Sequence, residues 1–226
     1  MIKITLPDGS VKEFASGVTP MEVAKSISEG FARNVISASF NGTTVETTTP
    51  LTTDGSLILY TWNDEDGKKA FWHSTSHVMA QVLEQMYPGI KLTLGPAIAN
   101  GFYYDVDFEE HKITEADFKK IEDRVLEISR GKHEFKLRPV SKADALELYK
   151  DNVYKTEMIT NLEDGTITFC DHDTFTDLCR GGHIPNTGII KAMKIMSVAG
   201  AYWRGDEKNK QLTRVYGISF PKQKDL

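Results

Sequence analysis

Two pairs of side chains able to do acid–base or metal chemistry stand out in the sequence. His73 and His77 form one pair, and Cys179 and His183 form the other. The members of each pair are four residues apart, and about a hundred residues separate the pairs. Residues at i and i+4 share one face of a helix, so each pair can converge on one small target. Two such pairs predict a functional site.

The residue types allow three kinds of chemistry. Two His, one Cys and a further His are acceptable tetrahedral zinc ligands, but four bound ligands leave no open position. A metal-free pocket could hold a hydrolytic water on His, with Lys155 and Asp177 completing it. Cys179 could instead act as a nucleophile, its pKa lowered by Arg180 or His183. The residue types alone leave all three open.

The first sixty residues predict a small unit of their own, in the order hairpin, helix, hairpin and final strand. Alternating β-branched residues favour strands, and Pro-Asp-Gly, Asn-Gly and Asp-Gly are turn signals. Thr19 is a good N-cap, with Pro20 at the first helical position. We expect strands over 2–6, 11–14 and 56–60, a helix from residue 20 to about 27, and turns at 41–42 and 54–55. This order is typical of a ubiquitin-like β-grasp fold.

A short polar run over residues 63–69 predicts a linker. The apolar stripe that follows predicts a helix over about 70–87, with His73 and His77 in its first turns. Further helices are expected over 114–130 and 141–151, and strands over 91–94, 102–106, 154–162, 166–170, 190–198 and 212–220. The second domain is therefore predicted to be α+β, a mostly antiparallel sheet covered by helices.

Composition narrows the class of protein. The chain has 226 residues, 40% hydrophobic and 26% charged, with a net charge of −5, which argues against a surface devoted to nucleic acid. Residues 188–226 nevertheless carry eight cations against three anions, a local excess that could face phosphates. Two cysteines make no disulfide framework, and neither a signal peptide nor a membrane span is evident. We expect a cytoplasmic protein.

Several motifs carry a resemblance to a known family. They are His73-Ser74-Thr75-Ser76-His77, Gly95-Pro96, Gly101 to Asp107, Asp177 to Asn186, Ala199 to Asp206 and Arg214 to Gly217. Together they resemble the N-terminal part of the bacterial threonyl-tRNA synthetases. Residues 1–62 resemble the TGS domain of that family, and residues 70–226 resemble its editing domain. The family's catalytic and anticodon-binding domains, which use ATP, magnesium and zinc, are expected to be absent here.

The resemblance implies a hydrolase that corrects mischarging. Serine lacks one methyl group of threonine, and a methyl group discriminates by only ~1–3 kcal/mol. The implied reaction is water attack on the ester of Ser-tRNA(Thr), in a site that excludes the larger threonine. The whole parent protein would ligate threonine to tRNA(Thr) with ATP.

The resemblance also implies which residues form the site. The catalytic group is His73, Lys155, His77, His183 and Cys179. The substrate-binding group is Asp177, Tyr104, Gly95, Pro96 and Arg180. No metal or cofactor is expected in this chain. Zinc at His73, His77, Cys179 and His183 is the alternative, because related alanyl-tRNA synthetase editing domains use this cluster to hold zinc.

The implied partner is the acceptor end of tRNA(Thr) carrying serine, and no membrane is expected. The parent protein would be a homodimer through its other domains, with this region itself a monomer. A competing hypothesis is a tRNA-binding module with an idle pocket, which retained tRNA affinity without ester cleavage would favour. A zinc-dependent hydrolase is the third hypothesis, which bound metal and sensitivity to chelation would favour.

Overall fold

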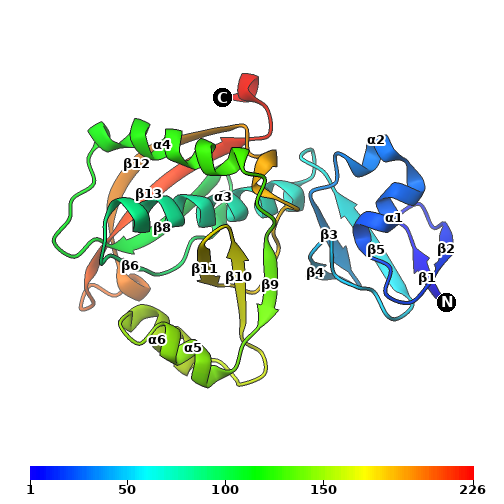
Figure 1. The fold of residues 1–226 in the computed structure, drawn as a ribbon, viewed down its shortest axis with the longest axis horizontal. Helices are drawn as coiled ribbons and strands as arrows, with labels where there is room; N and C mark the ends of the chain where they lie inside the picture. Colours follow the sequence, from blue (N-terminus) through cyan, green and yellow to red (C-terminus); the bar gives the residue numbers. More distant parts are fainter. The chain divides into compact units, whose positions relative to one another are not determined.

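The computed structural model describes residues 1–226, which separate into two compact units. The first comprises Met1–Phe71 together with the short segment Gly181–Pro185. The second comprises Trp72–Arg180 and Asn186–Leu226. Each unit is described by itself below, with the elements labelled in Figure 1.

The first unit is built on one five-stranded sheet. Its elements are β1 (Ile2–Thr5), β2 (Val11–Phe14), α1 (Pro20–Ile27), α2 (Glu29–Ala32), β3 (Ser37–Phe40), β4 (Thr43–Val45) and β5 (Gly55–Tyr60). The strand order is β2-β1-β5-β3-β4, with β1 and β5 parallel and the other pairs antiparallel. The predicted order of hairpin, helix, hairpin and final strand is confirmed.

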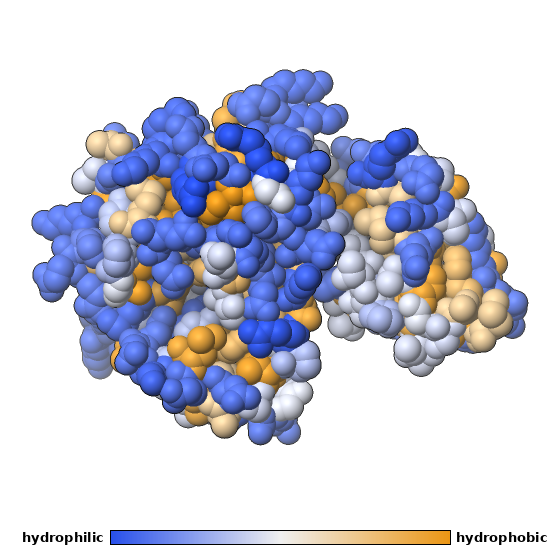
Figure 2. Space-filling model, in the orientation of Figure 1, coloured by the Kyte–Doolittle hydropathy of each residue, from blue (hydrophilic) through white to orange (hydrophobic).

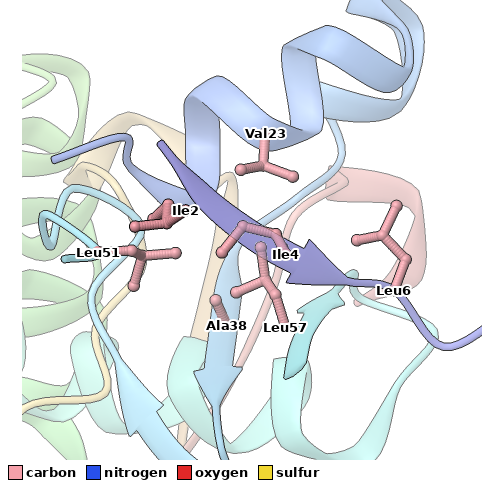
Figure 3. Packing of buried hydrophobic residues seen from close by; sticks show 7 residues of the cluster. All are labelled: Ile2, Ile4, Leu6, Val23, Ala38, Leu51 and Leu57. Atoms are coloured by element: carbon pink, nitrogen blue, oxygen red, sulfur yellow. The ribbon is translucent and has the colours of Figure 1, made fainter. Parts of the chain in front are cut away.

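The core of this unit follows from alternation along β1 (Figure 3). Ile2 and Ile4 point to the buried face of the sheet, where Val23 of α1 packs against them. Leu6, Ala38, Leu51 and Leu57 complete the cluster. At the start of α1 the Thr19 hydroxyl accepts from the Glu22 amide, and the Glu22 carboxylate accepts from the Thr19 amide. This capping box satisfies helix N–H groups that lack an intrahelical partner.

The second unit contains two sheets and four helices. Its helices are α3 (Glu65–Met86), which enters the unit at Trp72, α4 (Glu115–Arg130), α5 (Lys142–Leu148) and α6 (Val153–Thr160). Strands β6 (Lys91–Leu92), β7 (Ala97–Ile98), β8 (Gly101–Asp107), β12 (Ala192–Tyr202) and β13 (Gln211–Phe220) form one antiparallel sheet. Strands β9 (Lys136–Pro139), β10 (Thr168–His172) and β11 (Phe175–Leu178) form the other, also antiparallel. The predicted α+β class is confirmed.

Helices α3 and α4 lie across the larger sheet (Figure 1). The Trp72 indole N–H of α3 donates to the Ser219 carbonyl of β13 at 3.0 Å, and the Thr75 and Ser219 hydroxyls are 2.8 Å apart. Helix α4 buries Ile121, Val125 and Ile128. These contacts hold α3, which carries the His pair, against the sheet.

The prediction for residues 154–162 was wrong, because the segment is helical rather than extended. Its Tyr, Thr and Ile residues have high β propensity. The Asn152 side chain, however, caps the backbone N–H groups of Tyr154 and Lys155 and starts α6. Helix α3 also begins at Glu65, so part of the polar run expected to be a linker is helical.

Hydrophilic residues cover most of the molecular face shown in Figure 2, with scattered apolar patches. None of the helices combines the length and the apolar character needed to cross a lipid bilayer.

Candidate functional site

The His pair lies on one face of α3, as its spacing predicts. His73 Nε2 and His77 Nε2 are 3.3 Å apart, and the rings meet edge to face. His77 is buried and His73 is partly exposed. His73 is therefore the member of the pair that solvent reaches.

The Gly95 carbonyl oxygen bonds Nδ1 of His73, while Nε2 of the same ring faces His77. This oxygen accepts from His73 Nδ1 at 3.3 Å and from the Ser76 hydroxyl at 2.7 Å. A Cβ at this position would lie 2.3 Å from Tyr104 Cδ2, which no real contact allows. Only glycine lets this backbone approach both Tyr104 and α3 so closely.

Cys179 joins the pair from the end of β11. Its amide donates to the Thr168 carbonyl at 3.1 Å, and its carbonyl accepts from the Thr168 hydroxyl, so its backbone continues the pairing of β10 with β11. Cys179 Sγ lies 3.1 Å from His73 Nε2. Two ring nitrogens and one sulfur therefore converge at one point.

Asp177 is the buried centre of this arrangement, two residues before Cys179 and on the same buried face of β11. Oδ2 accepts from His77 Nδ1 at 3.0 Å and from the Tyr104 hydroxyl at 2.7 Å. Oδ1 accepts from Lys155 Nζ at 2.5 Å and from the Leu178 amide at 2.9 Å. The carboxylate thus orients side chains from three separate elements.

Lys155 reaches Asp177 because α6 is a helix. Residues Tyr154, Lys155 and Ile159 form the buried face of α6, and Lys155 is only 2% exposed. Its ammonium lies over the rings of Tyr104 and Tyr149, at 5.9 and 5.8 Å from their centroids. A buried ammonium needs a charged partner and aromatic contacts of this kind.

The buried charges shift the ionisation of their neighbours. Burial raises the pKa of Asp177, but the charge of Lys155 and the hydrogen bond from His77 outweigh it, so this pKa lies far below its ordinary value. Burial lowers the pKa of His77, but Asp177 and Cys179 outweigh it and raise this pKa above 6.5. Burial and the charge of Asp177 raise the pKa of Tyr104, which stays a neutral hydroxyl donor.

The hydrogen bonds fix the tautomers of both rings. The Gly95 carbonyl and the Asp177 carboxylate can only accept, so His73 and His77 each carry a proton on Nδ1. Two neutral rings in this form would bring two lone pairs together at the Nε2 atoms. The Cys179 thiol, whose sulfur lies 3.1 Å from His73 Nε2, can donate to one of these lone pairs.

The same donors suit a metal ion. The ligand atoms of His73, His77 and Cys179 lie within 4.8 Å of one another. Tetrahedral zinc separates N and S ligands by about 3.3–3.6 Å, close to the observed 3.3 and 3.1 Å. Zinc-bound His also commonly donates its other N–H to a carboxylate or carbonyl, as both rings do here. The donors of these three residues therefore fit zinc.

A cavity of about 530 Å³ opens beside Lys155 and Asp177. Its lining includes Glu84, Tyr149 and Asn152. Burial and the negative charge of Asp177 raise the pKa of Glu84. The cavity gives the buried ion pair a polar opening within the second unit.

His183 belongs to the first unit, in the segment Gly181–Pro185. It is buried, and its Nδ1 lies 3.0 Å from Glu46 Oε1. Glu46 follows β4 and was not predicted as a site residue, because an isolated Glu at a strand end carries no sequence signal. Ser76 stands in the quoted motif but was not predicted as a site residue, and its hydroxyl donates to the Gly95 carbonyl.

The structure thus brings together His73, His77, Cys179, Asp177, Lys155, Tyr104 and Gly95. Pro96 follows Gly95, and its carbonyl accepts from the Tyr103 amide at 3.3 Å. Arg180 is exposed.

Comparisons with known proteins find two family domains along the chain. Residues 2–61 match the TGS domain, and residues 166–216 match the Threonyl and Alanyl tRNA synthetase second additional domain. The chain is 88% identical to Threonine--tRNA ligase of Flavobacterium johnsoniae and 85% identical to that of Flavobacterium psychrophilum, over 226 residues in each case. It is 54% identical to that of Cytophaga hutchinsonii over 228 residues. Each match covers all of this chain and 35% of the relative.

Proposed function

We propose that this chain is the TGS and editing region of a threonine--tRNA ligase, and that it hydrolyses the ester of mischarged Ser-tRNA(Thr). The observation that carries the proposal is the convergence of His73, His77 and Cys179 on a buried Asp177–Lys155 pair. Similarity of 85% or more to two threonine--tRNA ligases over the whole chain supports the choice of substrate.

A second site is needed because one binding pocket distinguishes serine from threonine by only a small free energy. Serine differs from threonine by one methyl group, worth ~1–3 kcal/mol in a binding pocket. A second site that admits serine and excludes threonine by size multiplies this discrimination. The bond cut is the ester between the seryl carboxyl carbon and the ribose of the terminal adenosine.

In the proposed reaction, His73 takes a proton from the attacking water. Its partial exposure suits this task, whereas His77 is buried. Water oxygen bonds to the seryl carbonyl carbon, the ester C–O bond breaks, and the proton passes to the ribose oxygen. Lys155 donates to Asp177, so its ammonium positions the water and neighbouring groups by charge rather than by removing a proton.

The remaining residues shape the site in this proposal. His77, Cys179 and His183 form the wall of the cleft and contact the seryl or ribose groups. Asp177 binds the seryl ammonium or hydroxyl, and Arg180 contacts the exposed side of the substrate. Tyr104, Gly95 and Pro96 line the side that receives the adenosine.

The test is deacylation of Ser-tRNA(Thr) beside Thr-tRNA(Thr) by this chain after exhaustive chelation. Faster cleavage of the seryl ester supports a metal-free editing hydrolase. Equal rates for the two esters contradict the proposed selectivity. Binding of tRNA(Thr) with no cleavage favours the binding-module hypothesis instead.

A zinc-dependent hydrolase is the second candidate, favoured by the Nδ1 hydrogen bonds of both rings. His73, His77 and Cys179 would hold the ion, with His183 as a fourth candidate ligand. Bound zinc would supply a water of lowered pKa. Stoichiometric zinc in the purified protein, with activity lost on chelation and regained on adding zinc, supports this candidate. Metal-free protein with full activity rules it out.

The wider role is also a proposal. The parent protein would ligate threonine to tRNA(Thr) with ATP in the cytoplasm. It would form a homodimer through domains outside this chain, while the region described here is a monomer.

A further inference from the structure

The ammonium of Lys155 is a buried charge at the end of a flexible stem. It has three N–H donors, and two of them bond Asp177 Oδ1 at 2.5 Å and the Tyr104 hydroxyl at 3.4 Å. The third remains for another acceptor, such as the water of the proposed reaction. Lysine carries its charge on a flexible four-carbon stem, so the charge moves easily unless its surroundings hold it. Further contacts must therefore fix the ammonium in place.

The ring of Tyr149 lies beside this ammonium, in the same unit. Lys155 Nζ is 5.8 Å from the centre of the Tyr149 ring and 5.9 Å from that of the Tyr104 ring. The face of an aromatic ring is negative, and it attracts a cation within about 6 Å. The Tyr104 hydroxyl also donates to Asp177, whereas Tyr149 contacts the ion pair through its ring. Tyr149, Lys155 and Asp177 all line the cavity of about 530 Å³.

Three neighbouring elements hold Tyr149 in place. Its hydroxyl donates to the Thr176 carbonyl of β11 at 3.2 Å, and its ring meets that of Phe169 in β10 edge to face, with centroids 5.6 Å apart. Its carbonyl accepts from the Asn152 amide at 2.9 Å and from the Thr156 hydroxyl of α6 at 2.8 Å. Burial raises the pKa of Tyr149, so its hydroxyl stays a neutral donor. The ring is therefore fixed relative to both α6 and β11, the two elements that carry the ion pair.

The same side chain also fills space. Tyr149 packs against an apolar cluster in the second unit, formed by Ala145, Ile159, Ile167 and Phe169. A leucine could fill much of this space, so packing alone does not need an aromatic ring. A cation, in contrast, is attracted by the ring face and not by an aliphatic side chain. Leucine and phenylalanine at position 149 therefore separate the two roles.

We propose that Tyr149 is a positioning residue of the hydrolytic site, whose ring face holds the Lys155 ammonium against Asp177. It acts through Lys155 and does not touch the reacting atoms. All the contacts used lie within the second unit. The effect on catalysis rests on the proposed function, whereas the effect on the Lys155 side chain does not.

The first measurement is the mobility of the Lys155 ε-methylene group by ¹³C relaxation, with its signal assigned by the loss of that signal in K155R. In the wild-type chain we expect a restricted group, with an order parameter above about 0.6, unlike that of the exposed Lys191. A wild-type Lys155 as mobile as Lys191 would overturn the proposal without any variant of Tyr149.

The second measurement compares Y149L with Y149F and Y103L. Y149L keeps an apolar side chain but removes the ring, so we expect Lys155 to become clearly more mobile. Y149F loses only the hydroxyl and should leave Lys155 as restricted as in wild type. Y103L removes a ring beside another cation, Arg214, on the face of β8 opposite to Tyr104, and is the matched control. Unchanged mobility of Lys155 in Y149L, or equal loss of order in Y149F, overturns the proposal.

The third measurement is the rate of Ser-tRNA(Thr) deacylation. A displacement of about 1 Å at a reacting centre can cost about 100-fold in rate. We expect Y149L to lower kcat by about 10- to 100-fold with little change in KM, and Y149F and Y103L to keep wild-type rates. A more mobile Lys155 with unchanged kcat overturns the catalytic role of Tyr149. Wild-type protein without deacylation refutes the proposed function, and the relaxation result then still decides whether Tyr149 holds Lys155.

Discussion

At the scale of single residues, the candidate site of the second unit brings His73 and His77 together, and Nδ1 of each ring is bonded to an oxygen. The pairing of His73 with His77 could be predicted from the sequence, because residues four apart on a helix lie on the same face. The tautomers of the two rings could not be predicted from the sequence. The oxygens that bond these two rings, on Gly95 and Asp177, lie far from α3 along the chain and share no sequence pattern.

His73→Ala tests the role of the exposed ring. Loss of a general base costs about 10²- to 10⁴-fold in rate. We expect kcat for Ser-tRNA(Thr) deacylation to fall by this order, with KM nearly unchanged, in single-turnover and steady-state assays. His111→Ala, at a ring that binds the Pro88 carbonyl outside the site, is the matched control and should behave as wild type. Equal kinetics for H73A and wild type would remove His73 from the mechanism.

Gly95→Ala tests the close approach of the backbone to Tyr104. The added Cβ would lie 2.3 Å from Tyr104 Cδ2 and 2.9 Å from the Ser76 hydroxyl, so the ring or the loop must move. We expect a loss of about 1–3 kcal/mol in the free energy of unfolding, as for other overpacked sites, and a fall in deacylation. Gly89→Ala is a control with nothing close to the added Cβ, although its positive φ carries its own cost. Full stability of G95A would contradict the steric argument.

At the scale of elements, three pieces of the second unit must meet for Lys155 to reach Asp177. Strand β11 presents Asp177, β8 presents Tyr104 and α6 presents Lys155. The sequence correctly suggested Lys155 and Asp177 as companions, from residue type and resemblance. The prediction of a strand in place of α6 was wrong, because it gave the β-branched residues more weight than the Asn152 N-cap. A strand there would alternate Tyr154 and Lys155 between opposite faces, whereas the helix buries both.

Asp107 at the end of β8 ties these elements together, and its titration should be visible in stability. It accepts from the Tyr154 hydroxyl of α6 at 2.6 Å and from Lys210 at 2.8 Å. Burial raises the pKa of Asp107, but the hydrogen bonds from Lys210 and Tyr154 outweigh it and place this pKa below its ordinary 3.8. A carboxyl with a lowered folded pKa stabilises the protein above its unfolded pKa, and this contribution is lost as the pH falls through the folded value.

We therefore expect the free energy of unfolding of wild type to exceed that of Asp107→Asn at pH 6, by about 1.5–3 kcal/mol. The difference should shrink as the pH drops below 3.8, and urea titrations across this range measure it. Asp123→Asn, at an exposed carboxylate of α4, is the control. A difference that stays constant down to the lowest pH would contradict the assigned ionisation.

At the scale of the whole molecule, the sequence predicted the fold class and the first unit's topology well. Turn signals, a capped helix and alternating strands are local features, and the chain obeys them. The contact between Glu46 and His183 spans 137 residues and could not be predicted, because no local rule links a strand end to a distant loop. Tertiary contacts of this length need the structure.

The basic stretch near the end of the chain is also less free than its composition indicates. Of its eight cations, Arg204, Lys210 and Arg214 form ion pairs with Glu157, Asp107 and Asp105. Five cations remain for phosphate contacts if this stretch binds tRNA. Each neutralised phosphate contributes about −0.9 to the slope of log K against log salt. We expect a slope for tRNA(Thr) binding no steeper than about −4.5, measured by filter binding or anisotropy. A steeper slope would mean that cations elsewhere in the chain carry the binding.

The Glu46–His183 contact also has a consequence in time, while the chain is being made. A ribosome adds about 5–20 residues per second, so His183, 137 residues later, is made about 7–27 s after Glu46. All strands of the first sheet are complete by Tyr60, long before this loop exists. During that interval all strands of the first sheet have been made, but the residues that donate to the Glu46 carboxylate have not. The order of synthesis therefore allows the loop that carries His183 to meet a sheet whose strands have already been made.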